Sequence, residues 1–322
     1  MSPVPSSTPP SRSWADQGLY ALVVCIWGSS WVGLRLQVGT DVPVLDSVLY
    51  RFGLSALVLF GWCLLRGIPL RHNRHQHYAM AAQGILLFAI NYVLFYNSAR
   101  YLPGGLIAIL FSTVVIMNLA LGALFLGARL DVRVCLGAAF GLLGIGVVFI
   151  PELQTLSLES GTAKGIAFAL SGTVCAALGM TLSARNQRHG IGVMATNAWG
   201  MGYAGLALLA AVVVSGTPLR FDTSLTYIGG LLYLSLISSV VAFAAYLTLV
   251  GRIGVARASY STVLFPILAL ILSTYTDGYH WTWEAFAGIA LVLFGNVLVL
   301  YRPRPVAAPV VETCPQVAEE RV

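Results

Sequence analysis

The segment VIMNLALGALFLGARLDVRVCLGAAFGLLGIGVVF at residues 115–149 has a counterpart in PILALILSTYTDGYHWTWEAFAGIALVLFGNVLVL at residues 266–300. Three pairs of glycines coincide under a constant shift of 151 residues: Gly127 with Gly278, Gly137 with Gly288, and Gly144 with Gly295. The pattern of each segment predicts an apolar helix, then a short polar connection, then a second apolar helix. The shared register predicts a duplication, so the chain should consist of two similar halves.

The composition around these segments predicts a membrane protein. Of the 322 residues, 58% are apolar and 9% are charged, whereas about a quarter of the residues in a soluble domain are charged. The apolar runs are about 20 residues long, as a spanning α-helix requires, and they lack the ten-residue alternation of barrel strands. We therefore expect an all-α membrane protein that faces the lipid bilayer.

The apolar runs predict ten spanning helices, at residues 17–36, 46–66, 78–98, 104–126, 133–150, 163–184, 192–215, 225–249, 257–276 and 283–301. Basic residues gather in alternate connections, and cytoplasmic loops are rich in Lys and Arg. With both tails counted as cytoplasmic, thirteen of the 18 basic residues lie inside and four outside, and Arg51 lies within a span. Both termini are therefore expected in the cytoplasm, and no nucleic-acid partner is needed to explain the positive charge.

The predicted spans divide the chain into two repeats of five helices. The repeats should cover residues 17–150 and 163–302, joined by a linker at 151–162 and flanked by disordered cytoplasmic tails at 1–16 and 303–322. Because five is an odd number, the second repeat must enter the membrane from the opposite side. Such inverted-topology repeats recur in secondary transporters, where a site between the halves opens alternately to each side.

Several short motifs carry a family resemblance. They are WGSSW at Trp27–Trp31, Arg51-Phe52, LFST at Leu110–Thr113, LFLGARL at Leu124–Leu130, and in the second half Pro266, Gly278, Thr282-Trp283, Gly288 and Gly295. In their order and spacing, residues 17–302 resemble the EamA-type permeases of the drug/metabolite transporter superfamily. The chain departs from the family pattern where a helix 4 proline is replaced by Val115, and where two glutamates are replaced by Ala128 and Tyr279.

The resemblance implies a multi-pass protein of the bacterial inner membrane with a central cavity between its halves. Helices 1, 3, 4, 6, 8 and 9 should line that cavity, with helices 5 and 10 behind them. Polar side chains inside a bilayer turn toward the bundle interior, because lipid cannot satisfy them. The candidates on helices 1 and 3 are Trp27, Ser30, Trp31, Asn91, Tyr92 and Tyr96, with helix packing as the alternative role.

Helix 8 has a polar stripe at helical spacing, formed by Ser235, Ser238, Ser239 and Tyr246. We expect this stripe to line the translocation path, although small residues also permit close helix contact. Further cavity candidates are Ser112, Thr113 and Asn118 on helix 4 and Thr173 on helix 6.

Structural or gating roles are expected for six residues, namely Arg51, Pro266, Gly137, Gly144, Gly288 and Gly295. The glycines permit close helix packing. An intramembrane arginine also predicts an anchor for a carboxylate or phosphate, but Arg51 lies near enough to the end of its helix for its side chain to snorkel to the interface.

The predicted function is secondary transport, with export of a small metabolite such as an amino acid or an amphipathic organic compound. No Asp or Glu lies mid-span, which favours transport without proton coupling. We expect no catalytic residue, metal or cofactor; a membrane-embedded enzyme and a channel are the alternatives. The partners are a small-molecule substrate and lipid, and a homodimer is compatible with the pattern.

Overall fold

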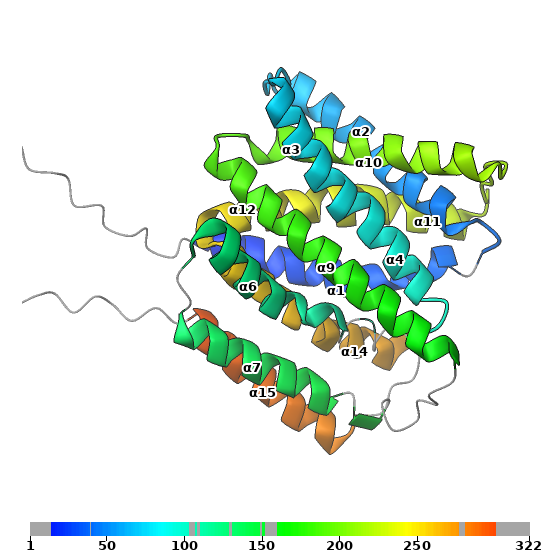
Figure 1. The fold of residues 1–322 in the computed structure, drawn as a ribbon. Coiled ribbons are helices and arrows are strands. Elements are labelled where there is room, and N and C mark those ends of the chain that lie inside the picture. The colour runs from blue at the N-terminus through cyan, green and yellow to red at the C-terminus, as the bar shows by residue number, and fades with distance from the viewer. Residues whose placement is uncertain are drawn as a thin grey trace, which may run out of the picture.

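The computed structural model describes residues 14–38, 40–102, 107, 110–128, 131–148, 150–151, 160–276 and 281–300. These residues fold into tilted helices connected by short turns, and none of them forms a strand (Figure 1). The predicted tails lie outside the described residues, except for residues 14–16, which begin the first helix. All-α structure is thus confirmed for the part of the chain that is described.

Five helical stretches are long and apolar enough to cross a membrane. They are α2 (Val44–Leu65), the stretch Arg74–Ser98, α9 (Ser160–Arg188), α10 (Val193–Ser215) and the stretch Leu225–Ile253. Shorter apolar helices are α6 (Val114–Leu126), α7 (Val132–Val148) and α15 (Trp283–Leu300). The first helix, α1, covers Trp14–Val38. Helical segments therefore occupy the predicted stretches, while the count of ten spans stays a prediction.

Two of the long stretches change helical pitch part-way along. The first consists of α3 (Arg74–Gly84), a π-helical segment η1 (Ile85–Ile90) and α4 (Asn91–Ser98). The second consists of α11 (Leu225–Leu232), a π-helical segment η2 (Tyr233–Val241) and α12 (Ala242–Ile253). The apolar runs predicted regular α-helices here. A π-helical segment within an α-helix is rare and is frequently found at a functional site.

The stretch predicted as one helix at 257–276 is broken. It consists of α13 (Val255–Ser259), a 3₁₀ turn η3 (Tyr260–Val263) and α14 (Phe265–Thr276). Pro266 follows the break, and a proline has no backbone N–H to donate to the carbonyl four residues earlier. The backbone can therefore tighten at η3. The side chain of Pro266 lies outside the described residues.

Helix ends follow local sequence signals. At the start of α3, the side chain of Asn73 accepts from the Gln76 backbone N–H at 2.9 Å, and the Gln76 side chain accepts from the Asn73 N–H at 3.0 Å. This reciprocal capping satisfies two N–H groups that lack helical partners. Helix α6 ends at Gly127, whose φ of +59° is readily adopted by glycine.

Helices from the two halves of the sequence pack against each other. Helix α1 contacts α11, η2, α12 and α14, while α2 packs along α10 and α4 packs along α9. In Figure 1, α1 runs through the middle of the bundle, whereas α7 and α15 form a separate pair at one side. The centre of the bundle is therefore built from both halves.

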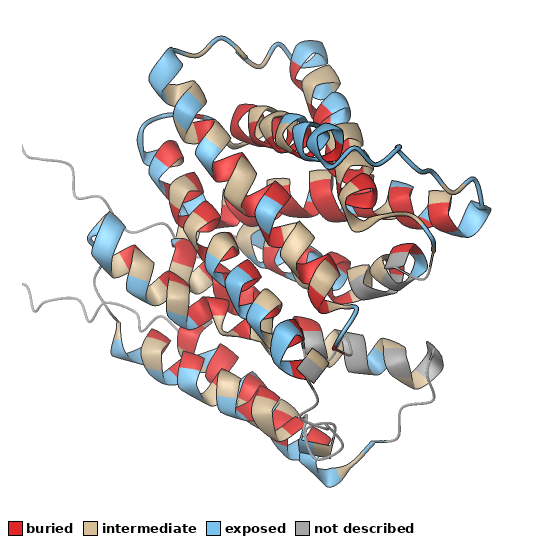
Figure 2. Ribbon diagram, turned by 45° about the vertical axis from the view of Figure 1, so that its right-hand side comes forward, coloured by how far each residue is buried: buried red, intermediate tan, exposed pale blue. Residues whose placement is uncertain are grey.

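The outward faces of the bundle are apolar. Large side chains there are widely exposed, such as Leu124 at 75% and Val214 at 87%, and Figure 2 shows buried positions concentrated on the inward faces. Such extensive exposure of apolar side chains is unusual in a soluble monomer. It agrees with lipid around the helices.

The pair of α7 and α15 is held at close range by the predicted glycines. A Cβ atom on Gly137 would lie 2.7 Å from the carbonyl oxygen of Gly295, and one on Gly144 would lie 2.5 Å from that of Gly288. These distances leave no room for a side chain. The four glycines therefore set the separation of the two backbones.

We expect Gly144→Ala to destabilise the folded protein in detergent by about 1–3 kcal/mol, because the added methyl must push α15 away. Gly146→Ala on the same helix is the matched control, since a Cβ there meets nothing within 4 Å. Thermal unfolding of the two purified variants measures the difference. Equal stability would show that the close approach of α7 and α15 does not depend on glycine.

Candidate functional site

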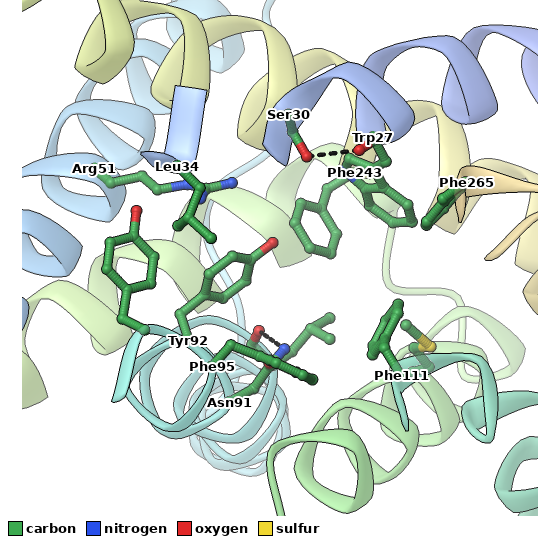
Figure 3. Close-up of a pocket in the computed structure, with 13 residues that line it drawn as sticks. Trp27, Ser30, Leu34, Arg51, Asn91, Tyr92, Phe95, Phe111, Phe243 and Phe265 are labelled. Atoms are coloured by element: carbon green, nitrogen blue, oxygen red, sulfur yellow. Dashed lines mark hydrogen bonds between the residues drawn. The ribbon is translucent and has the colours of Figure 1, made fainter. Parts of the chain in front are cut away.

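A cavity of about 90 Å³ lies in the middle of the bundle (Figure 3). Helices from both halves contribute to its wall, and most of that wall is aromatic or aliphatic. The lining residues are Trp27, Ser30, Leu34, Arg51, Leu87, Asn91, Tyr92, Phe95, Tyr96, Phe111, Met180, Phe243 and Phe265. A concave, mostly apolar space with a few polar groups is the usual form of a small-molecule site.

The two π-helical segments are equivalent in the repeat. The shift of 151 residues places η1 on residues 236–241, which lie within η2. The same shift places Tyr92 on Phe243, and both of these rings line the cavity. At the end of each segment the helical hydrogen bond spans five residues, from the Asn91 N–H to the Leu86 carbonyl and from the Ala242 N–H to the Ile237 carbonyl. The duplication is therefore visible at the cavity itself.

Return from π to α pitch leaves one carbonyl without a helical donor, and a side chain satisfies it in each half. In the first half, Asn91 Nδ2 donates to the Leu87 carbonyl at 3.0 Å. In the second half, Trp27 Nε1 donates to the Ser238 carbonyl at 3.0 Å. Leu87 and Ser238 are related by the shift of 151 residues. An unpaired buried carbonyl is costly, so these side chains stabilise the irregular turns.

Trp27 is surrounded by aromatic rings from the second half. Its ring centroid lies 4.8 Å from Phe243, 5.0 Å from Tyr246 and 5.4 Å from Phe265. The edge-on contacts with Phe243 and Phe265 suit the charge distribution of aromatic rings. The cluster gives one end of the cavity a rigid apolar wall.

Arg51 lies at the other end and is only 2% exposed. Its Nε donates to Ser239 Oγ at 2.9 Å and its Nη2 to Ser238 Oγ at 3.3 Å. The guanidinium carbon lies 4.4 Å from the centroid of the Tyr92 ring, within range of a cation–π interaction. The side chain thus turns into the bundle and does not snorkel to the interface.

Met180 separates this cavity from a second one. Its sulfur accepts hydrogen bonds from Tyr246 Oη at 3.2 Å and from Asn118 Nδ2 at 3.4 Å. Met180 lines the central cavity, whereas Asn118 lines a second cavity of about 560 Å³ that also includes Arg188 and Arg252. One layer of side chains therefore stands between the two spaces.

Five of the predicted cavity residues line the central cavity: Trp27, Ser30, Asn91, Tyr92 and Tyr96. Arg51, for which a structural or gating role was expected, lines it as well. Eight others do not line it in this conformation: Ser112, Thr113, Asn118, Thr173, Ser235, Ser238, Ser239 and Tyr246. Thr113 and Thr173 donate to carbonyls of their own helices. The polar stripe of helix 8 lies one layer behind the wall, where it holds Arg51 and Trp27. The side chain of Trp31 lies outside the described residues.

Several site residues were not identified from the sequence. Phe111, Met180, Phe243 and Phe265 resemble ordinary core residues, although the shift of 151 pointed from Tyr92 to Phe243. Asp46, in the first turn of α2, is buried, and its Oδ2 accepts from the Arg220 backbone N–H at 2.9 Å. Its other oxygen has no hydrogen-bond partner among the described residues.

A lipid-facing helical bundle with an internal cavity formed by two repeats is the architecture of a membrane transporter. Residues 18–150 and 163–301 each match the model of the EamA-like transporter family. The chain belongs to this family.

Known proteins agree with this membership. The chain is 30% identical to the Escherichia coli K12 inner membrane transporter YedA over 300 residues, which cover 91% of this chain and 94% of that protein. It is 22% identical to a Salmonella typhimurium protein named as a probable amino-acid metabolite efflux pump, over 87% of this chain and 93% of that protein. A solved crystal structure with 16% identity matches 90% of this chain and 97% of its own, with a TM-score of 0.73, which shows the fold.

We expect Trp27→Phe to lower stability by about 1–3 kcal/mol, because the variant keeps a ring but leaves the buried Ser238 carbonyl without its donor. Trp283→Phe is the control, since Trp283 is largely exposed. Thermal unfolding in the same detergent compares them. If both variants match the parent protein, the indole N–H does not stabilise η2.

Proposed function

We propose that the protein is a secondary transporter that exports a small metabolite by alternating access. The observation that carries this proposal is the central cavity, because both repeats line it and both place a π-helical segment beside it. Ten spans, arranged as two inverted five-helix repeats, would allow the halves to exchange conformations around this cavity.

Charge and contacts support an orientation with both termini in the cytoplasm. Arg252, in the last turn of α12, forms an ion pair with Asp16 in the first turn of α1 at 2.9 Å. The start of the bundle therefore lies at the same end as a connection rich in arginine. Such connections face the cytoplasm in most membrane proteins.

The expected substrate is a small amphipathic metabolite such as an amino acid. A polar end at Arg51 and an aromatic end at Trp27 give the cavity an amphipathic wall. The Salmonella relative is named as a probable amino-acid metabolite efflux pump, and this name supports export as the direction of transport.

The layer formed by Met180, Asn118 and Tyr246 is proposed as the inner gate. It separates the central cavity from the second cavity, which lies among the arginines of the proposed cytoplasmic end. Alternating access requires such a layer to part once per cycle, while the opposite end closes.

Flux measurements in proteoliposomes test the proposed function. Purified protein should produce saturable uptake of labelled amino acids and related metabolites, which unlabelled substrate inhibits. A unitary conductance would indicate a channel. Chemical conversion of the solutes without flux would indicate an enzyme.

Cross-linking tests the inner gate. In a chain without its five native cysteines, Asn118→Cys and Met180→Cys together should be joined by a short thiol-specific cross-linker. The bridge should stop flux, since the layer can no longer part, and reduction of the bridge should restore it. Each single variant treated with the same reagent is a control. Continued flux in the bridged protein would place the gate elsewhere.

Flux should change by less than about twofold between pH 6 and 8, because ordinary carboxylates have already lost their protons in this range. An imposed proton gradient should drive no accumulation. Measurement of initial rates at matched internal and external pH, and then with a gradient, separates the two effects. Accumulation driven by the gradient would indicate coupling through a titratable group, and buried Asp46 would be the first to replace.

A further inference from the structure

We infer that the central cavity selects solutes with a single carboxylate, which pairs with Arg51, and an apolar body, which packs against the aromatic end. This inference rests on the proposed transport function and specifies its substrate class. It starts from a buried positive charge whose partners are all neutral.

Arg51 is held in place by groups that do not neutralise it. The hydroxyls of Ser238 and Ser239 accept from Nη2 and Nε, and the face of the Tyr92 ring lies under the guanidinium. A guanidinium has five N–H donors. The phenol oxygens of Tyr92 and Tyr96 also lie within hydrogen-bonding reach of the guanidinium, and none of these partners carries a negative charge.

No carboxylate pairs with Arg51 in the described part of the chain. Asp46 is on the same helix, but it accepts from the Arg220 backbone, while Asp16 and Asp131 pair with Arg252 and Arg257. A buried cation without a counter-ion is costly. A bound anion would offset this cost, so the charge of Arg51 favours an anionic solute in the cavity.

The shape of the donor group favours a carboxylate. The guanidinium is planar and can donate two parallel hydrogen bonds to one carboxylate. Among the described residues that line the cavity, Arg51 is the one with a charge. A single positive charge suits a monoanion, and it suits a sugar phosphate or another multiply charged anion less well.

Asn91 provides a second polar contact. Its Nδ2 is engaged with the Leu87 carbonyl, whereas Oδ1 is buried and has no hydrogen-bond partner among the described residues. This oxygen can accept from an ammonium or hydroxyl group of the solute. An amino acid would use both Arg51 and Asn91, while a simple carboxylic acid would use Arg51 alone.

The aromatic residues of the cavity wall favour a solute whose other end is apolar. In Figure 3 Arg51 lies across the cavity from Trp27, Phe265 and Phe111. These rings offer an apolar surface without a charge. The arrangement therefore fits a solute that is anionic at one end and apolar at the other.

Isothermal titration calorimetry of the purified full chain with four probes tests this inference. Leucine, 4-methylpentanoate, leucinamide and 3-methylbutylamine share an alkyl body, but only the first two have a carboxylate. We expect both carboxylates to bind, with leucine tighter, and the other two probes to bind at least about tenfold more weakly. Equal binding of leucine and leucinamide, or no binding of either carboxylate, would overturn the inference.

Variants of Arg51 give a second test of the inference. Arg51→Gln should weaken binding of 4-methylpentanoate at least about tenfold. Arg51→Lys should weaken it less, because lysine keeps the positive charge but lacks the paired N–H donors of the guanidinium. Arg66→Gln, at the exposed end of the same helix, should bind as the parent does. If Arg51→Gln does not fold, binding of the four probes to the parent protein and to Arg51→Lys still tests whether Arg51 binds a carboxylate. Unchanged affinity in a folded Arg51→Gln variant would contradict the inference.

Flux of the same probes separates this inference from the proposed function. Carboxylate binding without flux in proteoliposomes would support the binding site and contradict the proposed transport function. Equal flux of leucine in the parent and in Arg51→Gln would support the transport function and would contradict Arg51 as the carboxylate anchor.

Discussion

Polar groups inside a bilayer must find partners within the protein, and the backbone of η2 depends on partners from the first half of the chain. Trp27 donates to the Ser238 carbonyl, Ser55 donates to the Ser235 carbonyl, and Arg51 donates to the hydroxyls of Ser238 and Ser239. These bonds connect α1 and α2 to a segment about 200 residues later in the chain. They hold the two halves together beside the central cavity, and Trp27 and Arg51, which donate these bonds, both line it.

The same bonds explain why the cavity combines charge with an apolar wall. The hydroxyls of η2 hold the guanidinium of Arg51 away from lipid, and the aromatic rings around Trp27 close the opposite end. Irregular turns are costly, and they persist where surrounding groups stabilise them. Here the stabilising groups, Asn91 and Trp27, also line the cavity. Changes in the packing of the halves would therefore act directly on the site.

Much of the architecture could be predicted from the sequence because it depends on periodicity and composition. The glycines at 137, 144, 288 and 295 predicted close helix packing, and in the structure they lie where α7 and α15 approach each other. Five residues predicted on helices 1 and 3 line the cavity. The π-helical segments could not be predicted, because no residue type requires that pitch. The direction of the helix 8 serines depends on this pitch: spacing for a regular α-helix pointed them at the path, whereas η2 turns them toward Arg51. The burial of Arg51 depends on that same long-range contact.

Accessibility of one cavity residue from each side of the membrane tests the central claim most directly. Ser30 lines the cavity, so Ser30→Cys, in a chain without native cysteines, should react with a small impermeant thiol reagent applied to sealed vesicles of known orientation. We expect the introduced thiol to react from each side of the membrane in turn, and to react more slowly when a transported solute is present. Reaction from one side alone under every condition, or from neither side, would contradict a central site with alternating access.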